Sequence, residues 1–249
     1  LFVRLRELPR PGRFDLRETA ASWAELAGTV REARRHPGLL RFIVARFFYS
    51  DPINTAIVVM AAFAVHAIGF TEGVALQVLL LLTVVAVLAS FGWGALADRW
   101  GPRRTLLVVL GTWVVGLIVV ASVPEPIPFL VAGALLGAGL GGVGVTDRLL
   151  LLRLAPADRV GAMLGLYGLV GKFSAVVGPF LYGTIVEALL PGMGRVAYQW
   201  AIASLLVLML VGIVIVRRVP EGRPIRDGEL TAATAGLEPA IVPPAGGPR

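Results

Sequence analysis

The chain has 249 residues, of which 57% are hydrophobic and only 16% charged, and its mean hydropathy is +0.81. Water cannot be the solvent for most of such a chain, which excludes an ordinary soluble domain. The absence of cysteine excludes disulfide frameworks, thiolate metal sites and cysteine nucleophiles. The net charge is +7, but the arginines flank apolar segments, so we expect anionic lipid headgroups rather than nucleic acid as partners.

The first 38 residues are polar and basic. Apolar residues recur every three or four positions between Leu16 and Val30, which predicts an amphipathic helix from Asp15 to about Arg35. A linker helix on the cytoplasmic face is the plain interpretation, and a regulatory or lipid-sensing helix is the alternative. The chain begins with Leu1 and an apolar tripeptide, too short for a signal peptide core of about 7–15 residues. We therefore expect a fragment of a longer protein.

Apolar segments long enough to cross a hydrocarbon core of about 30 Å follow this linker. They are expected as helices near residues 40–67, 74–97, 105–123, 127–147, 160–187 and 197–216. The predicted fold class is all-α, a polytopic six-helix bundle over residues 39–218 between a cytoplasmic linker (1–38) and a disordered cytoplasmic tail (219–249). Arginines gather after the second, fourth and sixth segments, whereas the loops around Glu72 and Glu125 have no Lys or Arg. The positive-inside rule thus places both termini in the cytoplasm, with the bundle in the plasma membrane.

Two charged residues fall near the middle of apolar segments. Asp51 lies roughly 16 Å beyond position 40 along a helix axis, next to Pro52, which interrupts the helical hydrogen bonds. Lys172, the only lysine, lies at a similar distance into the fifth segment. Charges at this depth are costly and are usually paired or functional, so we expect an Asp51–Lys172 pair facing a cavity, with Arg46 as the competing partner of Asp51. The plainer interpretation of Pro52 is a kink satisfied by neighbouring helices.

The fourth segment is rich in glycine. Gly133, Gly137 and Gly141 recur at four-residue spacing, which lets another helix approach closely. A helix that bends during transport is the alternative interpretation. Gly137 to Gly142 match the letters of a dinucleotide-binding loop, but no strand precedes them and the surroundings are apolar, so that function is rejected.

The loop after the second segment combines small residues, a short turn at Gly101-Pro102 and several arginines. Asp98, at the end of a helix, can accept hydrogen bonds from a neighbouring helix N-terminus. This string resembles the signature found after the second helix of each half in the major facilitator superfamily. The matching residues are Gly92, Leu96, Asp98, Arg99, Gly101, Arg103 and Arg104.

Two further stretches are similar to the autophagy-linked vacuolar effluxer family and its bacterial relatives. One runs from Arg46 to Thr55, and the other from Arg153 to Pro179. The resemblance covers about residues 40–216 and implies the C-terminal half of a twelve-helix transporter that works by alternating access around a midplane site. It implies that segments 40–67, 74–97, 127–147 and 160–187 line the cavity, while Asp98 contacts the other half. The candidate substrate or ion pathway consists of Arg46, Asp51, Asn54, Tyr167 and Lys172.

The expected function is secondary active transport of a small polar solute, with proton or sodium as candidate coupling ions. Eukaryotic members resemble amino-acid exporters, so an amino acid is a candidate solute. The expected partners are membrane lipids and either an N-terminal six-helix half or a second copy, which would cover the cavity face. The alternative is a non-transporting structural or regulatory six-helix protein, which would tolerate loss of both Asp51 and Lys172.

An enzyme is not expected, and neither is a cofactor or metal site. Asp51 has no second carboxylate at its depth for an aspartyl protease, and His36 and His66 lie too far from the middle of the membrane for a serine protease. No ATP-binding loop is present, because Lys172 follows glycine inside an apolar segment and precedes Phe173. An ABC-type permease would therefore need a separate ATPase.

Overall fold

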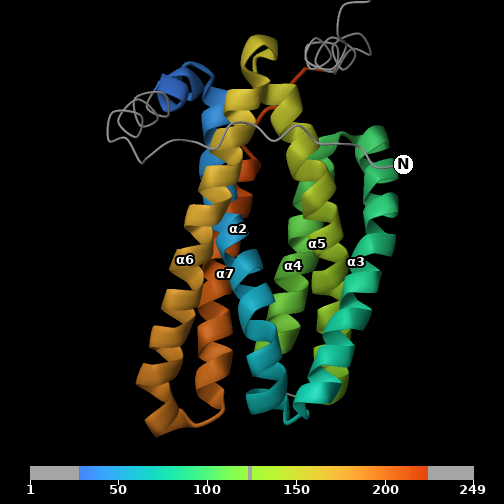
Figure 1. Cartoon of the computed structure of the whole chain (residues 1–249), viewed down its shortest axis with the longest axis vertical. Coiled ribbons are helices and arrows are strands. Elements are labelled where there is room, and N and C mark those ends of the chain that lie inside the picture. The colour runs from blue at the N-terminus through green and yellow to red at the C-terminus, as the bar shows by residue number, and fades with distance from the viewer. Residues whose placement is uncertain (1–27, 123–124, 224–249) are drawn as a thin grey trace, which may run out of the picture.

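The computed structural model describes residues 28–122 and 125–223. The predicted all-α class with six spans is confirmed in this part of the chain, whose long apolar helices are shown in Figure 1. They are α2 (Pro37–Phe63), α3 (Glu72–Trp100), α4 (Pro102–Ser122), α5 (Pro126–Leu154), α6 (Val160–Met193) and α7 (Val196–Val216). A π-helical turn, η1 (Ala64–Ile68), extends α2, and a 3-10 turn, η2 (Ala157–Arg159), precedes α6. The helix expected from Asp15 to about Arg35 lies mostly outside the described residues. Its last part, residues 28–35, is described and is helical.

Prolines and one glycine set several helix ends. Helices α2, α4 and α5 begin at Pro37, Pro102 and Pro126, at positions where the missing N–H of proline removes no helical hydrogen bond. Gly101 adopts a φ of 85° between α3 and α4, a backbone conformation that favours glycine. The turn at the signature loop is short for this reason.

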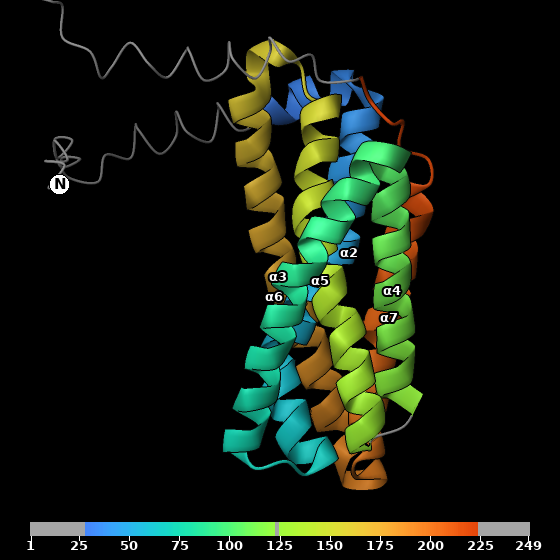
Figure 2. The same ribbon diagram turned by 90° about the vertical axis from the view of Figure 1, so that its right-hand side faces the viewer.

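The helices form two groups of three that lie side by side (Figures 1 and 2). In one group α2 packs with α6 and α7, and in the other α5 packs with α3 and α4. Helices α4 and α7 pack against each other and join the groups, whereas α2 and α5 make few contacts. Helices α3 and α6 bury the smallest share of their apolar surface. They therefore present the most apolar surface to lipid or to another protein.

Helix α5 approaches α3 closely along its glycines. A Cβ atom at Gly137 would meet the carbonyl oxygen of Leu82, and one at Gly141 would meet the carbonyl oxygen of Ala86. A Cβ atom at Gly133 would meet the side chain of Leu82. The backbones of the two helices can come this close only where side chains are absent.

Residues 217–223 lie against the end of the bundle where α4 begins. Val219 is fully buried, and the ring of Pro220 lies against Gly38. Arg103 donates its backbone N–H to the carboxylate of Glu221 at 3.3 Å. Residues 219–223, assigned on the sequence to the tail, thus pack against the bundle, and the rest of that segment lies outside the described residues.

Candidate functional site

A buried ion pair connects the two three-helix groups. Arg46 of α2 donates a hydrogen bond to Asp147 of α5 within a salt bridge, and the Asp147 side chain is 0% exposed. Tyr49 donates to Asp147 Oδ1 at 2.6 Å, and Tyr167 of α6 donates to Oδ2 at 3.4 Å. The Arg46 guanidinium also lies 3.5 Å from the centre of the Tyr167 ring. We call these four residues the Arg46–Asp147 cluster.

The cluster satisfies its buried charges within the protein. Both oxygens of Asp147 accept hydrogen bonds, and Arg46 also donates to the carbonyl oxygen of Tyr167 at 3.4 Å. A buried ion pair is tolerated only with such additional partners, because both charges have lost their water. The cluster lies where α2, α5 and α6 meet, so a movement of any of these helices must rearrange it.

A polar cavity of about 400 Å³ lies beside the cluster, between α2, α5 and α6. Arg46, Arg148 and Lys172 line it, and none of its lining residues is acidic. The side chains of Arg148 and Lys172 form no hydrogen bond or ion pair with any residue in the described ranges. The cavity therefore offers two unpaired positive charges to a ligand.

Asn54 ties α2 to α6 along the same cavity. Its side-chain amide donates to the carbonyl oxygen of Gly171 at 3.2 Å and to Ser174 Oγ at 3.4 Å. Together with Arg46 and Tyr167, it forms a polar wall that runs along the α2–α6 contact. Three of the five pathway candidates are therefore brought together here, and Lys172 lies at the same cavity.

Asp51 does not pair with Lys172, and it does not pair with Arg46 either. Its Oδ1 accepts a hydrogen bond from the backbone N–H of Gly178 at 2.6 Å, and no ion pair joins it to another described residue. Successive residues of a helix differ in direction by about 100°. Ser50 and Asn54 face the cavity, so Asp51, which follows Ser50, faces away from it.

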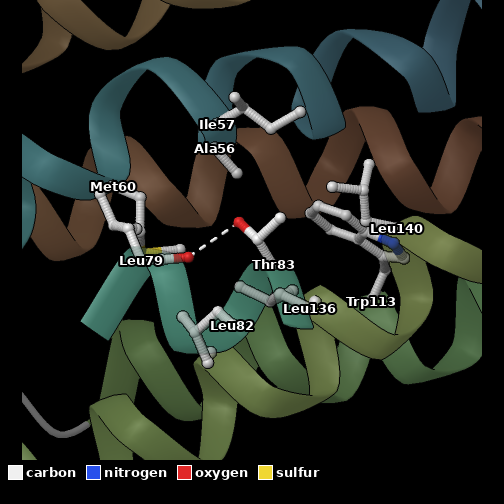
Figure 3. Close-up of a pocket in the computed structure, with 11 residues that line it drawn as sticks. Ala56, Ile57, Met60, Leu79, Leu82, Thr83, Trp113, Leu136 and Leu140 are labelled. Carbon is white, nitrogen blue, oxygen red and sulfur yellow. Dashed lines mark hydrogen bonds between the residues drawn. The ribbon is translucent and has the colours of Figure 1, made fainter. Parts of the chain in front are cut away.

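An apolar pocket of about 200 Å³ adjoins the polar cavity (Figure 3). Ile57 of α2 and Leu140 of α5 line both spaces. The hydroxyl of Thr83, visible in Figure 3, donates a hydrogen bond to the carbonyl oxygen of Leu79 at 2.9 Å. This hydrogen bond lies within α3, so the hydroxyl hydrogen is not directed at the pocket. The other walls are apolar, formed by Ala56, Met60, Leu82, Trp113, Gly133, Leu136 and Gly137.

The signature loop lies apart from the cavity, at the end of the bundle where α3 ends. Asp98 and Arg99 are exposed, and Asp98 forms no hydrogen bond or ion pair with a residue that the structure describes. Gly92 faces open space. Arg104 lies 3.8 Å from the carboxylate of Glu221, which also accepts the N–H of Arg103.

Sequence reasoning did not identify Asp147, Tyr49 and Arg148 as site residues. The sequence predicts the fourth segment near residues 127–147, so Asp147 falls at its predicted end. Helix α5 instead continues to Leu154, which places Asp147 two turns inside it. Arg46 and Tyr49, three residues apart, share one face of α2, and this spacing was the available signal.

The structure resembles the inward-open conformation of the xylose transporter XylE from E. coli with a TM-score of 0.55, so the fold of the six spans is that of the major facilitator superfamily. This likeness covers 74% of the chain and 48% of XylE, and at 18% identity it shows the fold alone.

Residues 2–229 match the family model described as vacuole effluxer Atg22 like, so the chain belongs to this transporter family. It is 28% identical over 200 residues to YxiO of Bacillus subtilis, an uncharacterized MFS-type transporter, covering 80% of the chain and 45% of YxiO. It is also 25% identical over 233 residues to autophagy-related protein 22 of Coccidioides immitis, covering 87% of the chain and 38% of that protein. The chain thus spans less than half the length of these relatives. The family predicted from the sequence is confirmed, and it is a family of transporters rather than enzymes.

Proposed function

We propose that the chain forms one half of a secondary active transporter that moves a small polar solute by alternating access. The observation that carries this proposal is the polar cavity between α2, α5 and α6, where Arg148 and Lys172 are unpaired. Charges at membrane depth are expensive and are retained where they bind or relay something. The cavity lies beside the Arg46–Asp147 cluster, so a solute that enters it lies next to the contact between the two helix groups.

The solute that best fits this cavity carries a carboxylate, as an amino acid does. Two unpaired cations and no acidic lining residue favour an anionic group, and Asn54 and Tyr167 add polar contacts. The adjoining apolar pocket can take an apolar side chain of the same solute. The family description names effluxers, which favours export as the direction of transport.

The cavity face is completed by a second six-helix unit, either another half of the same transporter or a second copy. Helices α3 and α6 expose many apolar side chains, and an unpaired charge such as that of Lys172 is costly against lipid. The arginine-rich end carries the signature loop, and we place it in the cytoplasm, with the bundle in the plasma membrane. The exposed carboxylate of Asp98 is then available to the second unit.

Solute flux tests the proposal. The polypeptide, at the full length that its gene encodes, is placed in lipid vesicles, and exchange of radiolabelled amino acids and of xylose is measured. We expect amino-acid exchange that falls at least about tenfold in Lys172→Gln, equivalent to about 1.4 kcal/mol. The control is Phe173→Leu, which alters an exposed neighbour outside the cavity lining. Full flux in Lys172→Gln would contradict the proposed site. If the wild-type protein exchanged neither amino acids nor xylose, a non-transporting role would be favoured.

A further inference from the structure

Two helices interrupted by proline meet at Asp51. Pro52 follows Asp51 within α2, and Pro179 follows Gly178 within α6. Proline has no N–H, so each helix lacks one backbone hydrogen bond at this level. The N–H of Gly178 is donated to Asp51 Oδ1 at 2.6 Å. A side-chain contact thus joins the two helices where both are weakened.

The second carboxyl oxygen of Asp51 has no partner. Asp51 Oδ2 and Thr55 Oγ1 are both buried, and neither makes a hydrogen bond. A Cβ atom at Gly178 would meet both oxygens, so they lie on the same side of this glycine. A buried carboxylate with a single hydrogen-bond donor is costly at membrane depth, whereas a neutral carboxylic acid is tolerated much better.

No charged group near Asp51 compensates for a negative charge. Arg46 is engaged by Asp147, and Lys172 lies at the polar cavity. Each helix that packs against α2 carries titratable groups. Among the residues that the structure describes, none of these groups forms a hydrogen bond or ion pair with the carboxyl group of Asp51. They are Arg41, Arg46 and Tyr49 on α2, His66 on η1, Glu72, Asp98 and Arg99 on α3, Asp147, Arg148 and Arg153 on α5, Tyr167, Lys172, Tyr182 and Glu187 on α6, and Tyr198 on α7.

We propose that Asp51 Oδ2 binds a proton and that this is the site of the coupling proton in the transport cycle. The inference deepens the proposed function and rests on it. The proton comes from water and converts the carboxylate to a neutral acid, which lies on the same side of Gly178 as Thr55 Oγ1. Loss of the proton leaves a charge that needs water, so the α2–α6 contact opens to admit it. Proton binding therefore favours the closed contact seen here.

A proton fits this place better than a sodium ion does. Asp51 Oδ2 and Thr55 Oγ1 each expose less than 1 Å² to solvent. A sodium ion needs several oxygen ligands around it and room for its own volume, whereas a proton needs only the carboxyl oxygen. The coupling ion is therefore the proton in this proposal, and sodium is an outcome that the test can detect.

Infrared difference spectroscopy between acidic and alkaline buffers tests the inference on the full-length protein in lipid vesicles. A protonated carboxyl group has a carbonyl stretching band that is separate from the carboxylate bands, and the measurement requires no transported solute. Other carboxyl groups also protonate in acidic buffer, so the test band is the component of the acid band that disappears at alkaline pH and is missing in Asp51→Asn. The asparagine oxygen still accepts the Gly178 N–H, so this variant should fold. The control Asp98→Asn alters an exposed carboxylate and should keep the band.

Three results would overturn the inference. They are the absence of any acid band at every pH at which the wild-type protein stays folded, an acid band in Asp51→Asn identical to that of the wild-type protein, and an Asp51-dependent component that is removed by sodium at constant pH. The last result would assign the site to sodium. Because the spectra require no flux, failure of this inference is distinguishable from failure of the transport assay.

Discussion

The guanidinium of Arg46 and the carboxylate of Asp147 join α2 to α5, two helices that otherwise make few contacts. The pair lies between the two three-helix groups and next to the polar cavity. Tyr49 and Tyr167 complete its hydrogen bonds from two different helices. The charge pair therefore holds together the part of the bundle that must move if the two groups rearrange around a solute.

Removal of both members of this pair should destabilise the protein by less than the sum of the two single removals. Arg46→Ala or Asp147→Ala leaves a buried charge without its partner, which costs about 3–5 kcal/mol. The double variant leaves neither charge, so its loss should be clearly smaller than the sum of the two single losses. Unfolding in detergent, followed by tryptophan fluorescence, measures all three variants. Strictly additive losses would mean that the two side chains do not interact.

The two tyrosines of the cluster should differ in importance. Tyr49→Phe removes a 2.6 Å hydrogen bond to a fully buried carboxylate and should cost about 1–3 kcal/mol. Tyr167→Phe removes one of 3.4 Å and keeps the ring under Arg46, so its effect should be smaller. Tyr182→Phe is the matched control, because its hydroxyl makes no hydrogen bond to a described residue. The same unfolding assay ranks them, and a larger loss for Tyr182→Phe than for Tyr49→Phe would contradict the geometry.

Two glycines of α5, Gly141 and Gly144, should respond differently to alanine. Gly141→Ala places a methyl group against the carbonyl oxygen of Ala86, so α3 and α5 must separate and stability should fall. Gly144→Ala meets nothing within 4 Å and should be neutral or gain about 0.5–1 kcal/mol from helix propensity. Melting temperatures of the two variants in the same detergent measure the difference. Equal shifts would show that α3 does not approach α5 at Gly141.

The membrane class, the six spans and the family could be predicted because they depend on hydropathy, on arginine placement and on a local motif. The direction in which a single side chain points could not be predicted from the sequence. Asp51 and Lys172 lie well inside α2 and α6, but one residue of rotation turns Asp51 from the cavity toward Gly178. Asp147 was missed because the extent of a long helix beyond its most apolar stretch is not visible in the composition.

Asp51 and Lys172 should therefore act independently. In a double-mutant cycle of Asp51→Asn and Lys172→Gln, the coupling energy in unfolding should stay within about 0.5 kcal/mol, as for groups without a shared partner. The same four proteins can be compared in the unfolding assay used for Arg46 and Asp147, whose coupling serves as the positive reference. A coupling energy above about 1 kcal/mol would instead support an interaction between Asp51 and Lys172, as their similar depth in the membrane suggested.

The most direct measurement of solute binding at the cavity uses the fact that Lys172 is the only lysine of the chain. The full-length protein in lipid vesicles is treated with an amine-reactive reagent, and modification of Lys172 is followed by mass spectrometry of its peptide. A transported amino acid should slow this modification. Because the amine of the amino acid itself consumes reagent, the control is an equal concentration of an amine that is not transported. Modification of Lys172 at the same rate with and without saturating solute would contradict a binding site at this cavity.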